Sequence, residues 1–422
     1  MSIKVCTETF DSQNPASLKT YINHDGYKAW KKIINQNISK SDVITKIKNS
    51  GLRGKGGAGF LTGLKWSFIP LADSEKYLVC NSDESEPGTC KDRDILRYNP
   101  HSIIEGMLIA SYAIGASVGY NYLRGEFIDE QWKVFNQALD EAYAEKLLGT
   151  NVFGSDISID IYALIGAGAY IVGEETAMLE SIEGKRGMPR IKPPFPAIKG
   201  LFEKPTIINN TETLASIPKI MLNEENWYKD IGIKESEGIK IFCMSGHLVN
   251  PGNFEVPLGT PFADLLKLAG GIWNNRKIKA VIPGGSSVPV VKGEIMMDVN
   301  MDYDSIAAVG SMLGSGGVIV MDESTCMVSV LHRISRFYYS ESCGQCTPCR
   351  EGTGWLYKIL SNLIEGRGSN NDLQQLDRIA SQIEGHCICA LGDAAAMPVR
   401  SFLKNFWQEF EYFVDKKESM VK

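Results

Sequence analysis

The sequence predicts a fold of the α/β class, followed by a small α+β module and a helical region. Three observations support this division of the 422 residues. Strand and helix patterns alternate up to about residue 225, strand patterns predominate from residue 239, and helical patterns follow Asp322. A chain of this length exceeds one compact core, so several folding units are expected.

The α/β part is predicted from short buried strands and amphipathic or apolar helices. Residues 41–50 form a predicted helix with apolar residues on one face and Gly51 placed to end it. The segment 76–80 is a predicted buried strand, and residues 102–119 are a predicted helix with a strand before it. The apolar segment 157–165 continues the alternation, which favours an open sheet.

The longest uncharged run, residues 107–123, is predicted to be a buried core helix and not a membrane span. It contains glycine, serine and asparagine, and Glu105 and Arg124 flank it closely. Any association with a membrane is therefore expected to come through a partner, with no direct span.

The module after the α/β part has a different order of elements. Residues 239–246 form a predicted strand, a turn follows at 250–252, and a second strand leads to a predicted helix within 260–271. Another strand is predicted in 278–285, and this order suggests a β-grasp arrangement. In the helical region, residues 372–384 carry apolar residues at helical spacing before a glycine, so one face should be buried in a bundle.

Composition excludes some functions. Hydrophobic residues make up 44% and charged residues 22% of the chain, which are ordinary values for a globular protein. The net charge of −6 gives no excess of positive charge for binding nucleic acid.

The first residues have the pattern of neither a signal peptide nor a transit peptide, so a mature cytoplasmic protein is expected. Five of the ten cysteines lie between residues 343 and 389, which is typical of metal binding.

Cys343, Cys346 and Cys349 have the C-x2-C-x2-C spacing that lets one short loop bind three corners of a cubane iron–sulfur cluster. Bacterial ferredoxins have a fourth cysteine three residues later, where this chain has threonine, so Cys387 or Cys389 must supply the fourth ligand. A structural zinc site is the alternative, although zinc sites usually pair two C-x2-C units. The pattern therefore predicts a cluster and electron transfer.

A glycine-rich loop at residues 54–59 matches the G-x-G-x-x-G pattern, whose glycines let backbone amides approach a diphosphate. It follows a predicted helix and not a strand, so the usual dinucleotide-binding context is absent. A tight structural turn is the alternative. The glycines assigned to cofactor binding are Gly54, Gly56, Gly57 and Gly59.

Positive and aromatic residues surround this loop. Arg53, Lys55 and Lys65 supply positive charge. Phe60 and Phe68 are placed to stack on a nucleobase, although core packing would also explain them.

Acidic and amide side chains form further candidate sites. Asp83, Glu84 and Glu86 suit ribose hydroxyls and would repel a 2′-phosphate, which favours NADH over NADPH, but a solvated acidic turn is the alternative. Glu174 and Glu175 begin a predicted helix, where the helix dipole alone would explain them. The amide-rich turn 209–212 has plain helix capping as its alternative.

Taken together, these motifs resemble the NADH-oxidising flavoprotein subunit of NADH:quinone oxidoreductase, respiratory complex I. The resemblance runs in order from about residue 50 to the end of the chain. The segments that carry it are GLRGKGGAGFLTGLKW, NSDESEPGTCKDRD, GAGAYIVGEET, INNTET, SCGQCTPCREG and CALGD.

The resemblance implies a Rossmann-like domain that binds FMN and NADH, a ubiquitin-like β-grasp module, and a helical bundle that holds a 4Fe-4S cluster. The expected boundaries are 1–62 for an N-terminal segment with the glycine-rich loop, 63–232, 233–322 and 323–422.

The family's binding residues carry over to matching positions. The implied FMN contacts are Gly54, Lys65, Asn81, Asp83, Glu84, Gly173, Glu174, Asn209, Asn210 and Thr211. The implied NADH contacts are Phe60, Lys65, Phe68, Glu86, Tyr170, Glu175 and Phe195. The implied cluster ligands are Cys343, Cys346, Cys349 and Cys389, the last because it belongs to CALGD. Hydride transfer would occur on FMN with no catalytic side chain, and Glu86 and Glu175 would tune the nicotinamide site.

Three positions depart from the family pattern. Cys90 stands where phenylalanine is frequent, Ser82 where alanine is frequent, and Cys387 where threonine is usual. The first two suggest altered packing under the flavin.

Two other functions compete with this interpretation. One is a diaphorase subunit of a soluble NAD-linked hydrogenase or formate dehydrogenase, which often carries an extra thioredoxin-like domain or ferredoxin cysteines; neither fits in 422 residues. The other is an iron–sulfur scaffold without nicotinamide chemistry. Membership of complex I implies a small 2Fe-2S partner subunit, a large iron–sulfur subunit, and a peripheral position on the cytoplasmic face of the bacterial inner membrane.

Overall fold

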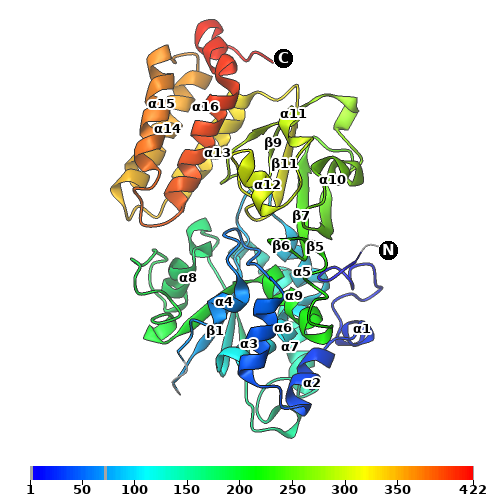
Figure 1. Cartoon of the computed structure of the whole chain (residues 1–422). Helices are drawn as coiled ribbons and strands as arrows, with labels where there is room; N and C mark the ends of the chain where they lie inside the picture. Colours follow the sequence, from blue (N-terminus) through cyan, green and yellow to red (C-terminus); the bar gives the residue numbers. More distant parts are fainter. Residues whose placement is uncertain (1–2, 71–73, 422) are drawn as a thin grey trace.

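Within the described residues, four short strands form the parallel sheet of the first part of the chain, and the edge strand β3 is only partly buried (Figure 1). The structure is a computed structural model that describes residues 3–70 and 74–421. The strands are β1 (Tyr77–Ser82), β2 (Val118–Leu123), β3 (Asp160–Ile165) and β4 (Thr206–Asn210), in the order β3-β2-β1-β4. All neighbours are parallel, so their carboxyl ends meet at one edge, where ligands bind in open α/β sheets.

Helices cover this sheet. Their bounds are α1 (Leu18–Asn23), α2 (Lys28–Asn35), α3 (Lys40–Asn49), α4 (Thr62–Trp66), α5 (Lys91–Tyr98), α6 (Pro100–Ile114), α7 (Gln131–Ala144), α8 (Glu175–Ile182) and α9 (Thr211–Leu222). The α3 helix confirms the helix predicted at 41–50, and the glycine-rich loop lies between α3 and α4. The α5 helix, which sequence patterns did not predict, lies between β1 and α6.

The prediction of one helix through residues 102–119 was wrong at its end. Gly115 adopts a left-handed conformation, with φ of +76°, and ends α6. The chain then enters β2 at Val118. The uncharged run 107–123 is therefore divided between a buried helix and a largely buried strand. The sequence pattern did not separate them, because periodicity alone does not distinguish a buried helix from a buried strand.

A mixed five-stranded sheet forms the next module, above the first part in Figure 1. Its strands and helices are β7 (Ile239–Gly246), β8 (Gly252–Pro257), α10 (Phe262–Leu268), β9 (Ile278–Ile282), β10 (Val291–Lys292), α11 (Gly293–Met296), α12 (Tyr303–Ala308) and β11 (Gly317–Asp322). The strand order is β10-β9-β11-β7-β8, with β11 parallel to β7 and the other pairs antiparallel. The predicted strand, strand, helix, strand order is confirmed. A small hairpin, β5 (Gly232–Ile233) and β6 (Ser236–Glu237), precedes it.

Four helices form the last part, at the top of Figure 1. They are α13 (Met327–Glu341), α14 (Thr347–Ile364), α15 (Asn370–Ile383) and α16 (Leu391–Lys416). The predicted helix 372–384 corresponds to α15, whose apolar residues are buried among its neighbours. In the described residues, no helix is both long and apolar enough to cross a bilayer.

Gly106 permits the closest helix packing in the first part, where α6 crosses α9. A Cβ atom at this position would lie 2.0 Å from the backbone oxygen of Leu214. Gly106→Ala should therefore lower the free energy of unfolding by about 1–3 kcal/mol, as overpacking does. Urea titration followed by circular dichroism measures this change. The matched control is Gly252→Ala, where a Cβ meets only Phe254 at 3.9 Å; equal stability of the two variants would contradict the packing argument.

Candidate functional site

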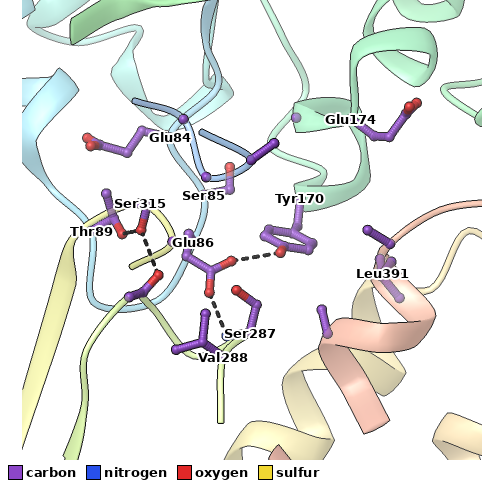
Figure 2. A pocket seen from close by; sticks show the side chains of 18 of the residues that line it. Glu84, Ser85, Glu86, Thr89, Tyr170, Glu174, Ser287, Val288, Ser315 and Leu391 are labelled. Carbon is purple, nitrogen blue, oxygen red and sulfur yellow. Dashed lines mark hydrogen bonds between the residues drawn. The ribbon is translucent and has the colours of Figure 1, made fainter. Parts of the chain in front are cut away.

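A cavity of about 620 Å³ lies where the three parts of the chain meet. Its volume falls in the range of ligand sites, about 300–1,000 Å³. The glycine-rich loop, the segment after β1 and the last residue of β4 form one side, the module another, and the start of α16 a third. Figure 2 shows Glu86 and Tyr170 turned toward each other in this space, with Ser287 beside Glu86.

The cavity brings together about half of the residues predicted to bind a cofactor. Those in its wall are Gly56, Gly57, Asn81, Asp83, Glu84, Glu86, Tyr170, Gly173, Glu174 and Asn210, with the predicted cluster ligand Cys389. Predicted cofactor contacts outside the wall are Gly54, Gly59, Phe60, Lys65, Phe68, Glu175, Phe195, Asn209 and Thr211.

Glu86 is held by groups from different parts of the chain. The hydroxyl of Tyr170 donates to Glu86 Oε2 at 2.7 Å, and the backbone N–H of Ser287 donates to Oε1 at 2.8 Å (Figure 2). Ser286 Oγ lies 3.3 Å from Oε1 and 2.9 Å from the hydroxyl of Tyr338 in α13. Burial raises the pKa of Glu86, although these hydrogen bonds oppose that shift. The carboxylate is therefore fixed in the wall by all three parts.

Glu84 and Asp83 differ in the hydrogen bonds that their carboxylate oxygens accept. The backbone N–H groups of Asp92 and Arg93 donate to Glu84 at 2.8 and 2.9 Å, so the first turn of α5 binds this carboxylate. Burial raises the pKa of Glu84 to about 8 and that of Asp83 to about 7. Asp83 Oδ1 accepts from Ser85, whereas no described protein group bonds to the buried Oδ2. A ligand hydroxyl in the cavity would satisfy that oxygen.

A buried charge cluster lies beside the glycine-rich loop. Glu212 in α9 pairs with Lys55 at 3.6 Å, and with Lys91 and Lys240 at 3.1 Å each. Lys91 also pairs with Asp92 at 2.8 Å. Burial disfavours the Glu212 carboxylate, but the three lysines outweigh it and lower its pKa to about 2. Lys55, Lys91 and Lys240 thus share Glu212 and Asp92 as counter-charges, and Glu84 is a third carboxylate that acts on Lys91, which lines the cavity.

Two predicted amide and carboxylate groups cap helices. Glu174 accepts from the N–H groups of Thr176 and Ala177 at the start of α8, both at 2.9 Å. Asn210 accepts from the N–H of Glu212 at the start of α9 at 3.0 Å. The capping alternative is therefore confirmed for Asn210, and Glu174, for which the helix dipole was the alternative, also caps a helix. Both side chains line the cavity.

Beside the cavity, Lys65 forms a chain of ion pairs. Its Nζ lies 3.0 Å from Glu175, which also pairs with Lys192 at 3.3 Å. Lys192 pairs in turn with Glu174 at 2.8 Å. This chain of alternating charges fixes Lys65 and Glu175 next to the wall.

Phe60, Phe68 and Phe195 are not core residues, because about half of each side chain is exposed. The rings of Phe60 and Phe68 lie 6.1 Å apart between centroids. Core packing therefore does not explain them.

The buried amide and hydroxyl groups Asn209 and Thr211 support the sheet. Asn209 Oδ1 accepts from the indole N–H of Trp66 at 2.8 Å. Thr211 Oγ1 bonds to Ser82 Oγ at 2.6 Å, and Ser82 donates to Asn121. The unusual serine at position 82 thus joins β1 to α9 and β2.

The five clustered cysteines lie in two loops of the bundle. Cys343 and Cys346 precede α14, Cys349 lies in its first turn, and Cys387 and Cys389 lie between α15 and α16. Cys349 interacts electrostatically with Cys343 and Cys346. Cys387 interacts with Cys346 and Cys349, and Cys389 with Cys343 and Cys349. The fold therefore brings the distant cysteines to the C-x2-C-x2-C loop.

Cys387 and Cys389 differ in their partners. The Cys387 thiol donates to the carbonyl oxygen of Ile383 at 3.5 Å, whereas Cys389 lines the cavity. Among described residues, no group of three or more Cys, His, Asp and Glu side chains is placed to hold a single metal ion. A cubane has a different requirement, because each of its cysteines binds a different iron atom.

Several residues of the site were not predicted from the sequence. Lys91 and Asp92 line the cavity and belong to the segment 81–94 that was singled out for its carboxylates, so they could have been included. Ser286, Ser287 and Tyr338 come from distant elements with no recognisable motif. Only the fold brings them to Glu86.

Three family models match separate parts of the chain. The Nuo51 FMN-binding domain matches residues 47–219, and the SLBB domain matches residues 241–291. The iron–sulfur binding region of NADH-ubiquinone oxidoreductase-F matches residues 329–413. These matches follow the three parts of the fold in order.

Curated relatives match most of the chain. The F subunit of NADH-quinone oxidoreductase from Rickettsia bellii is 54% identical over 380 residues, which cover 89% of this chain and 90% of the relative. The protein of the same name from Rickettsia akari is 54% identical over 375 residues, covering 87% and 88%.

Solved structures of an NAD⁺-reducing [NiFe]-hydrogenase are also similar. The air-oxidized state gives a TM-score of 0.84 at 31% identity and covers 98% of this chain and 67% of the hydrogenase chain. The H2-reduced state gives 0.80 at 32% identity and covers 89% and 63%. This chain therefore matches only about two thirds of that hydrogenase chain's length.

The charge cluster generates a stability prediction. Glu212→Gln should lower the free energy of unfolding by about 3–5 kcal/mol, because it leaves three buried lysines without their shared counter-charge. Urea titration at neutral pH measures the change. Glu224→Gln, at an exposed position two residues beyond the end of α9, is the control and should change stability by less than about 0.5 kcal/mol. If the Glu212 variant is as stable as this control, the charge cluster does not hold the glycine-rich loop, α5, α9 and β7 together.

Proposed function

The chain belongs to the family of NADH-quinone oxidoreductase F subunits, and we propose that the cavity between its three parts holds FMN and admits NADH. The family identity makes it the NADH-oxidising flavoprotein subunit of complex I, with a 4Fe-4S cluster. When bound, FMN supplies the chemistry that takes a hydride from NADH and passes electrons singly to an iron–sulfur cluster. The protein's residues bind and orient these groups, and no side chain serves as a catalytic acid or base.

One observation carries the proposed site: the wall of a single cavity contains both the predicted cluster ligand Cys389 and six of the ten predicted flavin contacts, which are Asn81, Asp83, Glu84, Gly173, Glu174 and Asn210. A flavin in this cavity would lie beside the loop of the bundle that presents the cysteines. Electrons would then pass from the α/β part to the bundle without leaving the chain.

Two features of the wall fit FMN. The buried Oδ2 of Asp83 is free to accept from a hydroxyl group, such as those on the ribityl chain. The ammonium group of Lys91 in the cavity wall suits a phosphate group. We keep as proposed FMN contacts Gly54, Lys65, Asn81, Asp83, Glu84, Gly173, Glu174, Asn209, Asn210 and Thr211, and we keep Gly56, Gly57 and Gly59 as proposed cofactor-binding residues.

NADH would approach from the side that carries exposed aromatic rings. Glu86 and Tyr170 lie in the wall and hold each other, so they would position the nicotinamide end. Phe60, Phe68 and Phe195 are exposed enough to stack on the nucleotide. Glu175, fixed by Lys65, completes the proposed set of NADH contacts.

The finer assembly is also a proposal. As part of complex I the chain works with other subunits, and we propose a small 2Fe-2S subunit and a large iron–sulfur subunit as neighbours on the cytoplasmic face of the bacterial inner membrane. We propose domains at 62–231, 232–322 and 323–422 after an N-terminal segment that ends before Thr62. These bounds differ from the expected ones because a boundary after residue 62 would cut α4 and a boundary after residue 232 would cut β5.

The second candidate is a diaphorase subunit of an NAD-linked hydrogenase. The similarity in fold to the NAD⁺-reducing hydrogenase favours it, with TM-scores of 0.80 and 0.84. Complex I ranks first because the identity is 54% to the Rickettsia bellii relative and 31–32% to the hydrogenase.

Replacement of one cavity residue tests NADH binding. Glu86→Gln in the holoenzyme should lower kcat/KM for NADH by about 10–100-fold, because a charged acceptor of hydrogen bonds is lost. The measurement is NADH oxidation with ferricyanide as acceptor, at matched FMN content. Glu294→Gln, an exposed position in the module, should keep the original rate. An unchanged kcat/KM in the Glu86 variant would show that Glu86 does not belong to the NADH site. If the wild-type protein purifies without FMN, that result would support an iron–sulfur scaffold.

The fourth cluster ligand can be identified by a matched pair of variants. Cys389→Ser should reduce the iron content and alter the low-temperature electron paramagnetic resonance signal of the cluster, because serine rarely replaces a thiolate ligand without consequence. Cys387→Ser should keep both properties. The opposite pattern would assign the fourth ligand to Cys387.

A further inference from the structure

Two cysteines outside the cluster lie in contact where the α/β part meets the module. The backbone N–H of Cys90, the residue that precedes α5, donates to the sulfur of Cys243 in β7 at 3.2 Å. They are 153 residues apart in the sequence. Neither cysteine has a role in NADH oxidation as proposed above.

Asn253 in β8 fixes Cys90 from the other side. Its Nδ2 donates to the carbonyl oxygen of Cys90 at 3.0 Å, and the Cys90 thiol donates to its Oδ1 at 3.4 Å. The same Nδ2 donates to Asp94 of α5 at 2.7 Å. The start of α5 is thus held against β7 and β8, with the two sulfur atoms on neighbouring surfaces.

The two thiols differ in reactivity. In its thiol form Cys90 donates to Asn253, and a hydrogen bond from Cys243 lowers the pKa of Cys90 to about 7, which makes its reactive thiolate form accessible near neutral pH. Cys90 is partly exposed, whereas Cys243 is buried, and burial raises the pKa of its thiol. Such an arrangement pairs an accessible nucleophile with a resolving thiol.

We propose that Cys90 and Cys243 form a peroxide-reactive dithiol that closes reversibly to a disulfide between α5 and β7. The Cys90 thiolate attacks hydrogen peroxide, breaks the O–O bond, and gives a sulfenic acid and hydroxide. The Cys243 thiol then displaces the sulfenic oxygen, which forms the S–S bond and releases water. The peroxide takes up the electron pair that both thiols lose, and an external dithiol reverses the reaction by thiol–disulfide exchange.

The position of this pair connects it to the cavity. Thr89 and Lys91, the chain neighbours of Cys90, line the cavity wall, and Thr89 Oγ1 bonds to Ser315 Oγ of the module. The first amides of α5 hold Glu84. A covalent bond at Cys90 would draw the start of α5 toward β7, so oxidation should also change the NADH oxidation rate.

Peptide mapping tests the proposal directly. The purified holoenzyme is treated with a stoichiometric amount of hydrogen peroxide, alkylated, digested without reductant and examined by mass spectrometry. A Cys90–Cys243 linked peptide should form in most molecules and disappear after dithiothreitol. Cys90→Ser and Cys243→Ser should each abolish it, whereas Cys326→Ser, at another partly exposed cysteine, should leave it unchanged.

The opposite results are equally clear. The proposal is overturned if peroxide-treated wild-type protein contains free Cys243 together with Cys90 that is free or singly oxidised. This result does not depend on how any variant folds. This test is independent of the proposed function, because the linked peptide is detected by its mass. If the peptide is absent, the assignment of NADH oxidation still stands. If the protein does not oxidise NADH, the peptide can still be detected. The NADH oxidation rate of wild-type protein should change at least about twofold on oxidation and recover with dithiothreitol, whereas Cys90→Ser should respond to neither treatment.

Discussion

The shared carboxylate of Glu212 constrains the arrangement of the site. A buried ammonium group is very costly without a partner, and three such groups come from three separate segments: the glycine-rich loop, α5 and β7. All three must meet at one residue of α9. This requirement fixes the loop and α5 beside the sheet and brings the module against them, because Lys240 belongs to β7.

The cavity follows from that arrangement and from the parallel sheet. Asp83 follows the carboxyl end of β1, and Asn210 is the last residue of β4. Both lie at the edge where open α/β sheets bind ligands. Glu86 then joins the loop after β1 to the module and, through Ser286 and Tyr338, to the bundle. The bundle is thereby placed with Cys389 in the cavity wall. Binding of a flavin and ligation of a cluster thus depend on the same set of buried polar contacts.

Sequence patterns predicted the fold class and the local motifs, because strand and helix periodicity and cysteine spacing are properties of short segments. They failed at the end of α6, where helix and strand are equally apolar, and they did not reveal α5, whose surface is largely polar. Contacts between distant segments were also beyond reach. Ser287 and Cys243 carry no motif, and only the fold shows that they touch Glu86 and Cys90.

Anaerobic addition of NADH to the purified FMN-containing holoprotein tests most directly whether one cavity connects the nicotinamide to the cluster. Visible absorption follows the flavin, and low-temperature electron paramagnetic resonance follows the cluster. The account predicts that NADH bleaches the flavin bands and that a signal from the reduced cluster accompanies the bleaching. A flavin that NADH reduces while the cluster accepts no electron, or a cluster present with no NADH-reducible flavin, would contradict it.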